Sequence, residues 1–164
     1  MKESILDGKI FLLVDDEPDV LKILSEEIME ACPNCSVDEA NTYEKAINKL
    51  ESTHYDLVIL DIMGVRGFDL LEAAVKKNMK AVMLTAHVLN AEALKRSHEM
   101  GARGYLPKET LGEVVPFIED VLNYKFEPGW KRLFEKLHGF FTENFETDWE
   151  EKTGMNWREW QGPS

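Results

Sequence analysis

The sequence predicts an α/β fold built on a doubly wound, five-stranded parallel sheet, followed by a helical extension at the C-terminal end. Up to about residue 124, short apolar segments alternate with longer segments whose apolar residues recur at helical spacing. Three of the short segments are apolar at almost every position, which is typical of parallel strands covered on both faces. Each return to a parallel neighbour requires a crossover, and the helical segments supply it.

The expected elements form five successive strand–helix units. We expect strands at 10–14, 36–40, 57–60, 81–84 and 104–106, and helices at 18–31, 43–53, 68–77, 90–100 and 110–123. In the last helix, Leu111, Val114 and Ile118 recur at helical spacing, whereas Glu113 and Glu119 face away from them. Open sheets of this kind commonly have the strand order 2-1-3-4-5, as in flavodoxin-like folds, and we expect that order here.

The charge balance excludes several classes of function. The 164 residues include 31 acidic and 19 basic ones, which gives a net charge of −12. A surface this acidic repels nucleic-acid phosphates and anionic lipids, so we expect neither a nucleic-acid partner nor a membrane. The longest apolar run, Ile10–Val14, is too short to span a bilayer, and no signal-peptide pattern follows Met1. We therefore expect a cytoplasmic protein.

The composition changes after Tyr124, and we predict a main domain over residues 1–124 and an extension over 125–164. The extension holds nine of the sixteen aromatic residues and all four tryptophans. Because Pro128 cannot continue a helix from 110–123, we expect a break at 126–129. A helix is then expected at about 128–150, with one aromatic and apolar face formed by Trp130, Phe134, Leu137, Phe141, Phe145 and Trp149.

The sequence leaves three alternatives for what this aromatic face contacts. It packs within the chain, or it forms a homodimer or docks a partner helix, or it lies on a membrane. The extension carries six basic and eight acidic residues, so charge does not favour the membrane. The same net charge of −2 disfavours a DNA-binding output domain in these forty residues.

Polar and charged side chains follow the strands of the predicted sheet. The carboxyl ends of parallel strands meet at one edge, where ligands bind in open α/β sheets. Alone, each such Asp is more often a helix cap, and each Lys a solvated surface group. Together they place three carboxylates, a hydroxyl and an ammonium in one crevice, on Asp15, Asp16, Asp61, Thr85 and Lys108. Clustered carboxylates repel one another without a cation, and oxygen ligands suit Mg²⁺, so the pattern predicts magnesium-assisted phosphoryl chemistry with one carboxylate as nucleophile.

Four segments carry a specific resemblance to a known family: LLVDDEPDVL at 12–21, YDLVILDI at 55–62, VMLTA at 82–86 and GARGYLPKE at 101–109. Over residues 9–123 the chain resembles a response-regulator receiver domain. The resemblance implies that Asp61 accepts the phosphoryl group, that Lys108 contacts it, and that Thr85 and Tyr105 form a switch pair. It also implies a Mg²⁺ site formed by Asp15, Asp16, Asp61 and the backbone carbonyl of Met63.

The resemblance implies a signalling protein, and not an enzyme. A histidine kinase or a histidine phosphotransfer protein would phosphorylate Asp61, and the chain would then contact a downstream protein, or a second copy of itself. In this family the hydroxyl of Thr85 turns toward the phosphoryl group, the Tyr105 ring takes the vacated space, and the surface formed by 90–100, 104–106 and 110–123 rearranges. For Tyr105 the alternative is a half-buried strand aromatic without a switching role.

Three departures from the family pattern concern the residues around this site. Gly64 and Val65 stand where many receivers have Met-Pro, and the following glycine comes two residues early, at Gly67, so we expect a shorter loop. Glu109, and not a proline, follows Lys108. His87 stands two residues after Thr85, where it acts either as a gate for water or as an exposed helix-start residue.

Two other classes compete with the phosphorylated receiver. A receiver-like adaptor would act without phosphorylation, through the aromatic extension. An aspartate-nucleophile phosphatase on a similar fold would have Asp-x-Asp directly after the first strand, whereas this chain has Asp15-Asp16-Glu17 there and its nucleophile candidate on the third strand.

Overall fold

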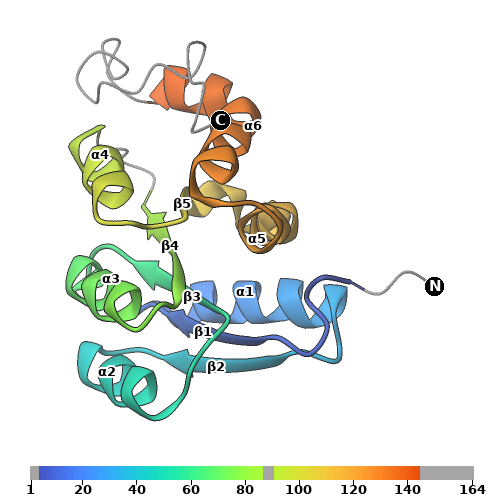
Figure 1. Ribbon diagram of the computed structural model, residues 1–164, viewed down its shortest axis with the longest axis vertical. Coiled ribbons are helices and arrows are strands. Elements are labelled where there is room, and N and C mark those ends of the chain that lie inside the picture. The colour runs from blue at the N-terminus through green and yellow to red at the C-terminus, as the bar shows by residue number, and fades with distance from the viewer. Residues whose placement is uncertain (1–3, 87–90, 145–164) are drawn as a thin grey trace.

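The computed structural model describes residues 4–86 and 91–144, and its centre is a five-stranded parallel sheet (Figure 1). The strands lie in the order β2-β1-β3-β4-β5, as the sequence predicted. They are β1 (Ile10–Val14), β2 (Ser36–Ala40), β3 (Leu57–Asp61), β4 (Lys80–Thr85) and β5 (Gly104–Pro107). The strands β1, β3 and β4 are buried at nearly every position, because helices cover both faces of the sheet.

Five helices alternate with the strands, as expected for a doubly wound fold. They are α1 (Pro18–Ala31), α2 (Tyr43–Ser52), α3 (Gly67–Lys76), α4 (Ala91–Glu99) and α5 (Val114–Asn123). Figure 1 shows α1 and α5 on one face of the sheet and α2, α3 and α4 on the other. Among the described helices, none is long and apolar enough to cross a membrane.

The predicted helix over 110–123 is wrong in its first part. A 3-10 helix spans Lys108–Glu113, and α5 begins only at Val114. Thr110 donates a hydrogen bond from its hydroxyl to the Pro107 carbonyl at 2.7 Å, which favours the tighter turn over a regular α-helix. Gly112 lowers the helix propensity of the same stretch further.

The predicted break at 126–129 is also wrong, because those residues form the first turn of α6 (Phe126–Asn144). The chain leaves α5 at Tyr124, whose backbone is extended, and α6 starts two residues later. Pro128 is tolerated there because N–H groups in a first helical turn have no partner within the helix. The expected end of this helix, with Phe145 and Trp149, lies outside the described residues.

The helix α6 covers the open edge of the sheet at β5, between α4 and α5 (Figure 1). Trp130 is fully buried and donates its indole N–H to the Ala102 carbonyl at 2.8 Å. Leu133 and Leu137 are also buried in the same core. The aromatic face therefore packs within the chain at Trp130 and Leu137, and it protects a strand edge that would otherwise offer unpaired backbone groups.

Replacing Trp130 with Phe tests this contact. We expect the Trp130→Phe variant to lose about 1–3 kcal/mol of unfolding free energy, because the buried Ala102 carbonyl loses its donor while most of the ring packing is kept. Urea unfolding followed by circular dichroism measures the difference. A change below about 0.5 kcal/mol would show that the hydrogen bond contributes little.

Candidate functional site

Two buried carboxylates meet at the carboxyl edge of the sheet. Asp15 directly follows β1, and Asp61 is the last residue of the neighbouring strand β3. The backbone N–H of Asp15 donates to the Ala40 carbonyl at 3.2 Å, and its carboxylate accepts the Glu17 N–H at 2.9 Å. These bonds hold Asp15 in place next to Asp61, so the predicted juxtaposition of the strand ends is confirmed for this pair.

Asp16 completes a cluster of three carboxylates. Each of Asp15, Asp16 and Asp61 offers one oxygen that lies within 4.8 Å of the other two. Asp15 and Asp61 are buried, whereas Asp16 is exposed, so the cluster opens to solvent on the side of Asp16. Buried carboxylates at this spacing repel one another strongly unless positive charge is close.

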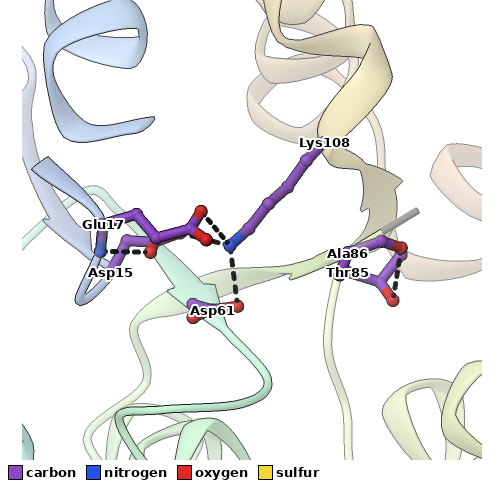
Figure 2. Close-up of polar contacts among 6 residues, drawn as sticks. All are labelled: Asp15, Glu17, Asp61, Thr85, Ala86 and Lys108. Atoms are coloured by element: carbon purple, nitrogen blue, oxygen red, sulfur yellow. Dashed lines mark hydrogen bonds and ion pairs between the residues drawn. The ribbon is translucent and has the colours of Figure 1, made fainter. Parts of the chain in front are cut away.

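Lys108 supplies positive charge to the cluster, and Figure 2 shows its ammonium directed at Asp15 and Asp61. It directly follows β5, and its ammonium lies 3.0 Å from Asp15 Oδ2 and 3.3 Å from Asp61 Oδ1. Glu17 is a third partner, at 3.1 Å from Oε2. The sequence analysis placed Glu17 only at a helix start and missed this contact, although an acidic residue two positions after Asp15 is the signal that would have pointed to it.

The pKa values at the site follow from this crowding. Burial and the charge of Asp15 raise the pKa of Asp61 from 3.8 to about 7, although Lys108 acts in the opposite direction. Burial also raises the pKa of Asp15. Burial alone would lower the pKa of Lys108, but its hydrogen bonds to Asp15 and Glu17 raise it above its ordinary value. Lys108 therefore stays charged at neutral pH, and the carboxylates remain short of positive charge.

The residues of the cluster fit a hard divalent cation. Three carboxylates face one ammonium, and all the donors are oxygens, which is the ligand type that Mg²⁺ prefers. Asp15 Oδ2 is buried with the Lys108 ammonium 3.0 Å away, and it keeps a further lone pair for a cation. Met63 follows in the loop after β3 with its side chain largely exposed. Its backbone carbonyl stays a predicted ligand.

The loop after β3 passes tightly over the cluster. Gly64 has a φ of +84°, a conformation that favours glycine, and a Cβ at this position would lie 2.6 Å from Asp16 Oδ2. At the start of α3, a Cβ on Gly67 would collide with the Asp61 carbonyl. The two glycines that mark the departure from the family pattern thus allow the backbone to approach Asp16 and Asp61 closely.

The predicted switch residues lie on the two strands next to the cluster. Thr85 is the last residue of β4, and its hydroxyl donates to the Ala86 carbonyl at 3.3 Å, apart from the Lys108 contacts in Figure 2. Tyr105 in β5 is completely buried, which differs from the half-buried aromatic of the alternative interpretation. Their switching role stays a prediction. His87 lies outside the described residues.

Comparisons with known proteins agree with this geometry. The model of the response regulator receiver domain family matches residues 11–115. A receiver domain protein (CheY-like) from Methanospirillum hungatei JF-1 is 26% identical, covers 71% of this chain and 97% of its own, and has a TM-score of 0.58. A two-component response regulator from Clostridium difficile shares the fold at 23% identity, with coverages of 70% and 96% and a TM-score of 0.63. The response regulator domain of Thermotoga maritima CheB does so at 18%, with coverages of 72% and 98% and a TM-score of 0.61. No curated protein matches the chain.

The crowding of carboxylates makes a prediction about stability. Because the pKa of Asp61 is raised to about 7 in the folded state, its charged form destabilises the fold fully above pH 7 and not at all below about pH 4. We expect Asp61→Asn to raise the unfolding free energy by on the order of 2 kcal/mol at pH 8 in EDTA. Urea unfolding at pH 8 and pH 4 measures this, and the gain should vanish at pH 4 and shrink when Mg²⁺ is added. A less stable variant at pH 8 would contradict the crowding.

The tight loop makes a prediction about the metal. Gly64→Ala places a methyl group against the Asp16 carboxylate and strains the backbone, so we expect Mg²⁺ affinity to fall by about tenfold or more. Gly112→Ala is the matched control, because a Cβ there meets nothing within 4 Å. Isothermal titration with Mg²⁺ compares the variants. Equal affinities would show that the loop does not constrain Asp16.

Proposed function

The chain belongs to the response regulator receiver domain family, and we propose that it is a phosphorylated response regulator with Asp61 as its phosphoryl acceptor. Such domains are signalling modules and not classical enzymes. The observation that carries the proposal is the contact of Lys108 with Asp61, inside a cluster that contains two further carboxylates. The proposed donor is a histidine kinase or a histidine phosphotransfer protein, because the family receives phosphoryl groups from phosphohistidine.

The proposed reaction uses Asp61 as the nucleophile. One of its carboxylate oxygens attacks the phosphorus of the phosphohistidine and forms an acyl phosphate. The P–N bond breaks, its electron pair leaves with the imidazole, and the imidazole takes up a proton from water. Lys108 lies 3.3 Å from Asp61 Oδ1, so its ammonium is placed to compensate charge on the transferred phosphoryl oxygens.

Asp15 and Asp16 have a different role in this proposal. With Asp61 and the Met63 carbonyl, they would hold Mg²⁺ at the open side of the cluster. When bound, the ion supplies positive charge to the carboxylates and to the phosphoryl oxygens. Without positive charge, the buried Asp15 and the exposed Asp16 would repel the incoming phosphoryl group, so the proposed transfer requires the cation.

The output of the phosphorylated protein is proposed to be a protein contact. Thr85 and Tyr105 would act as the switch pair, and a downstream protein or a second copy of the chain would recognise the rearranged surface. The net charge of −12 supports a protein partner over nucleic acid or an anionic membrane. A cytoplasmic location, together with the kinase, is part of the proposal.

Intact mass spectrometry tests the acceptor directly. After incubation with Mg²⁺ and acetyl phosphate, we expect the wild-type protein to gain one phosphoryl group. Asp61→Asn should gain none, because it lacks the nucleophile, and EDTA should prevent the gain in the wild type. Asp69→Asn is the matched control, because Asp69 is an acidic residue of α3 whose described ion pair is with Arg66 and not with the cluster.

Each other outcome contradicts the proposal in a different way. An adduct that persists in Asp61→Asn would move the acceptor to another residue. The absence of an adduct in the wild type, with phosphoramidate as a second donor and with rapid quenching, would favour the adaptor that acts through its aromatic extension without phosphorylation.

A further inference from the structure

We propose that α6 is the element that reads the state of Asp61: phosphorylation weakens the docking of α6 on the face formed by α4, β5 and α5. The proposal rests on the proposed function, because it needs a phosphoryl group at Asp61. It adds a regulated contact within the chain, with α6 as the occupant that leaves and the α4–β5–α5 face as the surface that becomes available.

A small set of contacts docks α6. Trp130 bonds to the Ala102 carbonyl, and Asp120 on α5 is held by two cations of α6, with Arg132 at 3.1 Å and Lys136 at 2.5 Å. The side chains of Arg132 and Lys136 remain 42% and 33% exposed. Ion pairs exposed to this degree contribute little stability, so the docking of α6 depends mainly on its fit to the core.

The fit between α6 and the rest of the molecule is close. The cavity bordered by β5, α5 and α6, with Leu133 among its lining, measures about 10 Å³, no more than a single water needs. On the side of α4, the centroid of the His98 ring lies 5.0 Å from that of Phe126 and 5.1 Å from that of Trp130. Because side chains here are closely packed, even a small displacement of β5 breaks contacts with α6.

Ala102 links α4 to α6 just before the start of β5. Its N–H donates to the Ser97 carbonyl of α4 at 2.9 Å, and its C=O accepts from Trp130 of α6. Arg103, the next residue, donates its N–H to the Ala81 carbonyl and starts the pairing with β4. A movement of α4 or β5 relative to β4 therefore acts directly on the hydrogen bond that holds Trp130.

The strand β5 connects this junction to Asp61. It has four residues: Ala102 lies two positions before its start and Lys108 directly follows its end. A phosphoryl group at Asp61 offers Lys108 new oxygen partners, which compete with Asp15 and Glu17 for the ammonium. The last residue of β5, Pro107, pairs with Thr85, so a movement of Thr85 reaches the same short strand.

The direction of the effect follows from the packing. In the unphosphorylated arrangement, Trp130 and Leu133 of α6 are buried in the core beside β5, and Trp130 makes its hydrogen bond. A displacement of β5 opens space at this contact or lengthens the bond, and both changes disfavour the docked helix. Released, α6 presents Trp130, Leu133 and Leu137 to solvent, an apolar stripe suited to a helix of another protein.

Hydrogen exchange of the full chain tests the proposal, with beryllofluoride and Mg²⁺ as a stable substitute for the phosphoryl group. We expect the amides of 126–137 to exchange about tenfold faster when beryllofluoride is bound. Asp61→Asn should show no change on the same addition. Unchanged or slower exchange of these amides in the bound wild type would overturn the inference.

A second measurement uses the reciprocity of coupled equilibria. If bound beryllofluoride weakens α6 docking by a given factor, beryllofluoride must bind the chain with α6 undocked more tightly than the chain with α6 docked, by that same factor. Asp120→Asn removes the partner of Arg132 and Lys136, so we expect exchange in α6 to rise by about two- to fivefold and the beryllofluoride affinity to rise by at most the same factor. Glu119→Gln removes one charge from α5 without breaking those ion pairs, and it should match the wild type. Faster exchange in Asp120→Asn together with a lower beryllofluoride affinity would overturn the inference, because weakened docking cannot lower the affinity of a ligand that favours the undocked state.

The acetyl phosphate experiment distinguishes a wrong proposed function from a wrong role for α6. If the wild type forms no adduct at Asp61, both the proposed function and this inference fall. If the adduct forms and the amides of α6 exchange as before, the acceptor role of Asp61 stands and only the role of α6 is wrong.

Discussion

The contact of the Lys108 ammonium with Asp15, Glu17 and Asp61 organises the functional edge of this molecule. It joins the ends of β1, β3 and β5, which lie far apart in the sequence, around one positive charge. Because a single ammonium cannot neutralise these carboxylates, the site keeps a deficit of positive charge. A magnesium ion and a phosphoryl group with it would complete the charge balance that the fold leaves open.

The same shortage of positive charge destabilises the folded protein at this site. Burial places Asp61 where its charge is disfavoured, which raises its pKa, and the close approach of Gly64 to Asp16 leaves little freedom for the loop above it. Proteins accept such local instability where the chemistry needs it. The hydrophobic strands β1, β3 and β4 supply the stability that holds the carboxylates together.

The helix α6 gives the chain a feature outside the matched family region, which ends at residue 115. It covers β5, so residues of the same chain protect the exposed edge of the sheet. It also occupies the face that a partner of α4, β5 and α5 would need. The position of Ala102, bonded both to α4 and to α6, makes that occupation sensitive to how β5 is placed.

The sequence by itself determined the sheet, its strand order and the cluster at its edge. The residues Leu57–Leu60 of β3 are apolar throughout, and parallel strands bring Asp15, Asp61 and Lys108 to the same edge whatever the details of the loops. Only the tertiary structure decided the rest. Whether Thr110 would bond to Pro107, whether Pro128 would end a helix or begin one, and whether Glu17 would reach Lys108 all depend on where neighbouring elements lie. The contact of Trp130 with Ala102 was also decided only by the tertiary structure. The sequence indicates that an aromatic face must be buried, but the residues that it packs against depend on the arrangement of the elements in three dimensions.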